Sequence, residues 1–134
     1  MDSLQVRTGQ VSLRILDDEG NERGIFRFNP EDVEGAKKVV ALRDELDNKQ
    51  GEFVEREKQC KTADEKLDLL DETVTYFKEA IDNCFGAGTS ELVFGQAKSL
   101  SMFSDFLVGI TPYYSKASEE RLKKYRNRKP TAKK

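Results

Sequence analysis

An apolar residue recurs every seven positions through the middle of the chain. This heptad stripe places apolar side chains along one side of helical structure, where other polypeptide must cover them. At the companion heptad positions, Lys49 and Arg56 come first and apolar residues follow later, so the stripe broadens along the chain. The pattern predicts helix packing and indicates no chemistry. Its members are Val39, Leu46, Phe53, Cys60, Leu67, Val74 and Ile81.

The composition favours one thin helical domain. The 134 residues fit a single domain, and 36% charged with 37% hydrophobic residues leave little material for a thick core. No apolar run approaches the roughly 18 to 20 residues that cross a bilayer. The acidic, polar start Met1-Asp2-Ser3 is unlike a secretory signal. We therefore expect a soluble, intracellular protein.

The first thirty residues predict a β-hairpin, at about residues 6–29. Apolar and more polar residues alternate over 11–16, turn-forming residues occupy 17–21, and an extended pattern resumes at 25–28. Isolated two-stranded ribbons are marginal in water. We therefore expect Phe26 and Phe28 to rest on a helix or to pair with a neighbouring subunit's strand.

Two helix-start signals occur in the middle of the chain. Asn29 can cap a helix whose first residue is Pro30. Thr62 and Glu65 have the spacing of a capping box, which predicts a second helix. We favour an antiparallel helix pair, because it buries the heptad stripe without a partner. One uninterrupted helix is the alternative, because the heptad phase continues across Thr62.

The glycine-containing run at residues 86–90 has two interpretations. Glycines before a helix can let backbone amides approach a phosphate. This run follows a helix rather than a strand, however, and no lysine comes before Lys98. We therefore interpret it as a helix stop at Gly86, in the left-handed conformation, followed by a short helix that Thr89 or Ser90 caps.

The C-terminal part predicts an amphipathic helix. Apolar residues recur at spacings of mainly three and four from Leu100 to Tyr114, and Pro112 should kink or restart the helix. The whole chain is therefore expected to be mainly α, with an N-terminal β-hairpin, an antiparallel pair of long helices and a C-terminal amphipathic helix. We expect a single domain over residues 1–125 and a basic disordered tail at 126–134.

No catalytic, metal or cofactor site is evident from the residues. Histidine is absent, so the commonest metal ligand and the commonest acid or base near neutral pH are missing. Cys60 and Cys84 both fall on the apolar seam, which indicates reduced, buried thiols. We therefore predict a protein that is not an enzyme and binds neither metal nor cofactor.

The charge is concentrated toward the C-terminus. Residues 116–134 hold nine basic side chains against Glu119 and Glu120, whereas the rest of the chain is acidic. Such a segment can contact nucleic-acid phosphates, but the acidic body would repel the same polymer. We therefore expect a protein partner, with nucleic-acid binding as the less favoured alternative.

A protein partner could bind the apolar side of the C-terminal helix. Such an apolar helix face is more often core than binding surface, but three helices are few to cover all of it. We take it as the candidate surface for a partner helix or strand. The candidate residues are Phe94, Phe103, Phe106, Leu107, Ile110 and Tyr113.

Several runs resemble a small protein family from prophages of gram-positive bacteria, whose genes lie among tail genes. The runs that carry the resemblance are residues 26–30, 81–90, 93–95, 103–106, 109–113 and 124–125.

The resemblance implies a role in phage tail morphogenesis in the cytoplasm of a bacterial host. Among tail proteins, the resemblance favours a role like that of tail assembly chaperones, which coat the tape measure protein until tail tube subunits polymerise around it. The implied partners are phage tail proteins, with a homo-oligomer expected and no membrane contact. A structural tail component is the alternative role.

Overall fold

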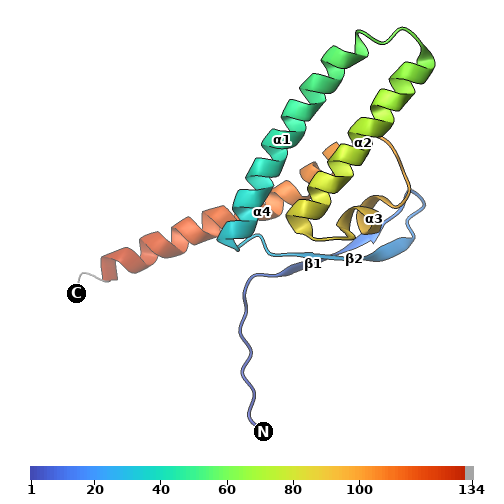
Figure 1. The fold of residues 1–134 in the computed structure, drawn as a ribbon. Coiled ribbons are helices and arrows are strands. Elements are labelled where there is room, and N and C mark those ends of the chain that lie inside the picture. The colour runs from blue at the N-terminus through green and yellow to red at the C-terminus, as the bar shows by residue number, and fades with distance from the viewer. Residues whose placement is uncertain (132–134) are drawn as a thin grey trace.

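The structure, a computed structural model, is a long helical hairpin that projects from a smaller part of the molecule (Figure 1). We call this smaller part the base; it consists of the sheet, the short helix and the first part of the C-terminal helix, at residues 11–28, 89–94 and 101–114. It describes the backbone of residues 1–131 and the side chains of residues 1–123. In chain order the elements are β1 (Val11–Leu16), β2 (Glu22–Phe28), α1 (Val33–Glu57), α2 (Ala63–Phe85), α3 (Thr89–Phe94) and α4 (Ser101–Thr131). This architecture confirms the predicted mainly α fold with an N-terminal hairpin.

The strands β1 and β2 form a two-stranded antiparallel sheet, as predicted. Asp17 closes the turn, because its Oδ1 accepts hydrogen bonds from the amides of Glu19 and Asn21 at 3.0 and 2.8 Å. Phe26 and Phe28 are buried in the core of the same chain. The hairpin therefore rests on the protein's own helices, and its buried face needs no neighbouring subunit.

Helix α1 begins three residues later than the Asn29 motif predicts. Its N-cap is Asp32, whose Oδ2 accepts a hydrogen bond from the Gly35 amide at 2.7 Å. Asn29 instead stabilises the preceding turn, where its Oδ1 accepts from the Glu31 amide at 2.9 Å. The Asn29 side chain also donates to the Thr8 carbonyl at 2.8 Å. It therefore joins the N-terminal segment to the start of α1.

The chain breaks between α1 and α2, so the helix pair is correct and the single long helix is not. Thr62 caps α2, with its Oγ1 accepting from the Glu65 amide at 3.1 Å. The Thr62 hydroxyl also donates a hydrogen bond to the Glu65 carboxylate at 3.2 Å. This is a variant of the predicted capping box, because the carboxylate accepts from the hydroxyl rather than from the Thr62 amide. Figure 1 shows the two helices side by side and antiparallel.

The heptad stripe is buried near the base and opens toward the tip of the α1–α2 hairpin. Phe53 and Cys60 are partly buried, whereas Leu67 is 60% exposed. Leu67 lies on the same helix and in the same heptad phase as Val74 and Ile81, so its exposure follows from its position near the start of α2, away from the base. The members nearest the base are each at most 5% exposed: Val39, Leu46, Val74 and Ile81.

A side chain of α2 caps the short helix α3. Asp82 accepts hydrogen bonds from the Ser90 amide at 2.8 Å and from the Ser90 hydroxyl at 3.1 Å. The predicted helix stop and start is confirmed, but the capping side chain is Asp82 rather than Thr89 or Ser90. Gly86 has a φ of 120°, and Gly88 is the left-handed residue, with a φ of 90°.

Helix α4 passes through Pro112 without the predicted restart. Pro112 cannot donate to the Val108 carbonyl, but both residues are exposed, so water can hydrate that carbonyl. The helix continues to Thr131. The predicted disordered tail at 126–134 is therefore helical up to residue 131, and residues 132–134 lie outside the described residues.

A row of aromatic rings fixes α4 against the rest of the molecule. Neighbouring ring centroids in this aromatic row lie 4.9 to 5.7 Å apart, and edge-to-face contacts are frequent. Such contacts add to the stabilisation from burial. The row connects α2, α3, α4 and β2. In spatial order its members are Phe77, Phe103, Phe94, Phe106, Phe26, Phe28 and Tyr114.

We predict that Phe103→Ala lowers the free energy of unfolding by about 3 to 5 kcal/mol, as expected for a large core side chain. Phe103 is 2% exposed and contacts the rings of Phe77 and Phe94. Val108→Ala is the control, because Val108 is on the same helix and 69% exposed. Urea unfolding followed by circular dichroism measures both, and equal small losses would contradict the role of the aromatic row.

Candidate protein-binding site

A groove runs between α1 and α4 on one side of the base. It consists of two adjoining hollows of about 470 and 430 Å³, and Arg43 and Thr111 line both. Along α1 the lining extends from Ala36 to Gln50, and along α4 from Arg121 back to Ser101. The two helices therefore form antiparallel walls. We call this feature the α1–α4 groove.

The α1–α4 groove has an apolar floor, and exposed apolar side chains stand among polar ones on its walls. Leu46 and Phe103 are buried core residues that line its floor. Val40 on α1 and Val108 on α4 line opposite walls and are 60% and 69% exposed. Exposed aliphatic side chains on both walls of one concave surface are typical of a site that receives another polypeptide.

The charges in the α1–α4 groove are mostly positive. Arg43 lies where the two hollows join, and Arg121 lines one end, where its guanidinium donates to the Glu31 carbonyl at 3.2 Å. Asp47 is the single carboxylate on the walls. Arg43 forms no ion pair with any residue of the described part of the chain. The groove therefore suits an apolar surface that carries a carboxylate.

The six candidate residues predicted from the sequence do not form one surface. Phe103 and Leu107 line the α1–α4 groove. Tyr113 packs edge-on against Phe28, with ring centroids 5.7 Å apart, and is 37% exposed. Three others line a different groove, beside β1: Phe94, Phe106 and Ile110.

Four of the six candidates belong to the core of the single chain. Each of these four is at most 8% exposed: Phe94, Phe103, Phe106 and Ile110. The hairpin, α2 and α3 cover them, because the aromatic row joins all these elements to α4. In this conformation they support a binding surface from below, and a partner can reach mainly Leu107 and Tyr113.

The residues of α1 that complete the groove were not among the predicted candidates. Val39 belongs to the heptad stripe, but Val40 and Arg43 lie off it. A signal for them exists in the sequence, since Val40 is an apolar residue beside a stripe position. Only the position of α4 shows that Val40 faces a groove rather than open solvent.

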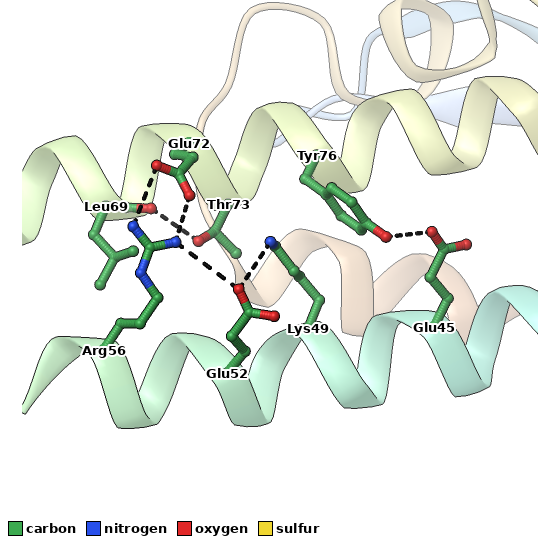
Figure 2. A network of polar contacts seen from close by, with 8 residues as sticks. All are labelled: Glu45, Lys49, Glu52, Arg56, Leu69, Glu72, Thr73 and Tyr76. Carbon is green, nitrogen blue, oxygen red and sulfur yellow. Dashed lines mark hydrogen bonds and ion pairs between the residues drawn. The ribbon is translucent and has the colours of Figure 1, made fainter.

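A polar network joins α1 and α2 above the base (Figure 2). Arg56 pairs with Glu72 at 2.5 Å and lies 3.9 Å from Glu52, which also contacts Lys49 at 3.2 Å. Glu72 is the main cause that raises the pKa of Arg56, and Arg56 in turn lowers the pKa of Glu72. Lys49 and Arg56 are the charged companions of the heptad stripe, and they bridge the helices beside the buried Leu69.

Tyr76 adds a second polar link between the same helices. Its hydroxyl donates to Glu45 at 2.5 Å, and the Lys49 ammonium lies 4.5 Å from the centroid of its ring. The hydrogen bond to Glu45 is the largest cause that raises the pKa of Tyr76. The network is mostly exposed to solvent, so each of its ion pairs contributes little to stability.

Cys84 and Tyr114 form a partly buried titratable pair near the base. Burial is the main cause that raises the pKa of the Cys84 thiol to about 11 and that of the Tyr114 phenol to about 12. Lys38 opposes the shift at Cys84, and Asp32 adds to the shift at Tyr114. Both cysteines are free thiols. The core therefore holds Cys84 and Tyr114 in their neutral forms.

Among the described residues, no group of three or more Cys, Asp or Glu side chains is placed to hold a metal ion. No helix of the described backbone combines the length and the apolar character needed to span a bilayer.

Comparison with known proteins gives one match. Residues 20–134 match DUF6673, a family of unknown function. No curated protein and no solved structure matches the chain.

We predict that alkaline pH destabilises the fold through Cys84 and Tyr114. Their folded pKa values exceed the ordinary 9.0 and 10.0, so the unfolded chain loses these protons first. The stabilisation is complete below about pH 9 and is lost as the pH rises through about 11 to 12. Urea midpoints across this range measure it. The double variant Cys84→Ala with Tyr114→Phe should lose less stability than the wild type, and an equal loss would contradict the prediction.

Proposed function

The chain belongs to the DUF6673 family, and from that premise we propose that it is a protein-binding module that acts without catalysis. The α1–α4 groove receives an amphipathic helix of a partner protein. The observation that carries this proposal is the pair of exposed valines, Val40 on the α1 wall and Val108 on the α4 wall, in two adjoining hollows that share Arg43 and Thr111.

The length of the groove supports a helical occupant. Its α1 wall extends from Ala36 to Gln50, which corresponds to about 21 Å at 1.5 Å per residue. A helix of about four turns has the same length. Such a helix presents apolar side chains at positions i, i+3, i+4 and i+7 to a groove between two walls.

The charge of the groove narrows the class of partner. Arg43 lies at the centre of the lining, where an arriving helix would desolvate it. A carboxylate on the partner would compensate that cost and fix the register. We therefore infer a partner helix with an apolar stripe and at least one Asp or Glu on the same face.

The biological role that we propose rests on the resemblance of the sequence to tail-region proteins of gram-positive prophages. We propose that the protein is a tail assembly chaperone and that its client is the tape measure protein. A client that must later be released suits a groove with two exposed valines and two arginines, because such a surface supports weak, reversible binding. A structural tail component is the alternative role.

We predict that Val40→Asp and Val108→Asp each weaken the complex with the tape measure protein of the same prophage by about tenfold or more. A buried valine contributes about 1.5 to 3 kcal/mol, and a buried aspartate would add a desolvation cost. Val54→Asp is the matched control, because Val54 is also on α1 and 43% exposed but lies outside the groove lining. Co-purification followed by titration calorimetry measures the change.

The charge of the groove gives a second test. We predict that Arg43→Glu weakens the same complex, and that Lys37→Glu, an equal charge change outside the groove lining on α1, leaves it unchanged. Circular dichroism would verify that the variants fold. Unaltered affinity of the Val40, Val108 and Arg43 variants would exclude this groove as the binding site. Presence of the protein in purified tails would favour the structural alternative.

A further inference from the structure

The sheet has an edge that the described chain leaves unpaired. β1 pairs with β2 on one side and with no strand on the other. Proteins usually cover or protect such an edge, because its free backbone groups can accept another strand. β1 carries no proline, and the apolar Leu16 at its end is 56% exposed. The edge is therefore open to strand addition.

An apolar groove follows this edge. It has a volume of about 390 Å³, and β1, α3 and α4 form its walls. Four consecutive residues of β1, Leu13–Leu16, line it, so the groove runs along the edge of the strand rather than under one face. Met102, Phe106 and Ile110 form its α4 wall. We call this feature the β1 groove.

The N-terminal arm, residues 1–10, has the sequence of a strand but pairs with no strand in the described chain. Leu4 and Val6 alternate with the polar residues Ser3, Gln5 and Arg7. Leu4 is 88% exposed and Val6 is 71% exposed. Figure 1 shows the arm extended and directed away from the base. An extended segment with alternating apolar residues matches an open strand edge that has an apolar groove beside it.

The arm is anchored so that it leaves its own molecule. The Thr8 carbonyl accepts a hydrogen bond from the Asn29 side chain, and Gly9 lies against Glu31 with a φ of 98°. To reach its own β1 groove, the arm would have to reverse at Gly9 and break the contact with Asn29. Residues 1–8 can instead extend by about 26 Å from this anchor, because an extended residue spans at most about 3.3 Å.

We propose that the N-terminal arm of one copy adds as a third strand to the β1 edge of a second copy, with Leu4 and Val6 in the β1 groove. The β1 groove carries one charge of each sign, Arg14 and Asp105, so its electrostatics do not oppose the arm. The donating and accepting surfaces differ, so repeated addition produces a ring or a chain of copies. Two copies that exchange arms would form a closed dimer by the same contact.

The first test is the mass of the full-length protein in solution, measured by light scattering during gel filtration at increasing concentration. The wild type should form oligomers. Leu4→Asp with Val6→Asp should be monomeric, because these substitutions place carboxylates in an apolar groove. Ser3→Asp with Gln5→Asp is the matched control, since it adds the same charge on the other face of the arm, and it should still form oligomers.

The second test separates donor from acceptor. Leu16→Asp alters the β1 groove and should prevent assembly, whereas Ile25→Asp, on β2 outside the groove lining, should not. A mixture of the arm variant and the Leu16→Asp variant should form a one-to-one complex, because one copy keeps a working groove and the other a working arm. A homo-oligomer insensitive to the arm variant would overturn the proposal, and so would a wild type that stays monomeric while its arm occupies its own groove.

This proposal is independent of the proposed function. The α1–α4 groove and the β1 groove share no lining residue. Loss of client binding in the Val40 or Val108 variants should leave the oligomeric mass unchanged, and the arm variant should retain the α1–α4 groove. Failure of one proposal would therefore be distinguishable from failure of the other.

Discussion

The position of α4 depends on contacts between aromatic rings. The aromatic row joins α4 to α2, α3 and β2, which are far apart along the chain. A small protein with many charged residues has few ways to fix a long helix, and large flat rings bury much area per residue. Once the row positions α4, its remaining sides form a wall of the α1–α4 groove and a wall of the β1 groove. Core packing thus creates both surfaces.

Local signals predicted the elements well and their ends less well. The strand alternation and the Thr62 capping box are encoded within a few residues, so the hairpin and the helix break could be predicted. The α3 cap could not, because Asp82 lies eight residues before Ser90 and reaches it only when α2 and α3 pack together. Pro112 predicts a kink or a restart of the helix, because the sequence does not show that water can reach the carbonyl that the proline leaves free.

The candidate site was predictable only in part, for a general physical reason. Helical periodicity indicates that a face of a helix is covered, but not which neighbour covers it. Phe103 and Phe106 are therefore equivalent in the sequence pattern, and both are core residues in the structure. They differ in place, because Phe103 lines the α1–α4 groove and Phe106 lines the β1 groove. Val40 was missed because its environment comes from α4, about seventy residues away in the sequence. Binding sites formed between distant segments require the tertiary arrangement.

The α1–α2 hairpin has a graded strength along its length. Near the base its seam is apolar, whereas farther out Arg56, Glu72 and Glu52 hold it together at the surface. Dissolved ions weaken such exposed pairs much more than they weaken apolar packing. The contacts of the outer turns therefore depend more on ionic strength than those near the base, although the buried Leu69 contributes apolar packing there as well.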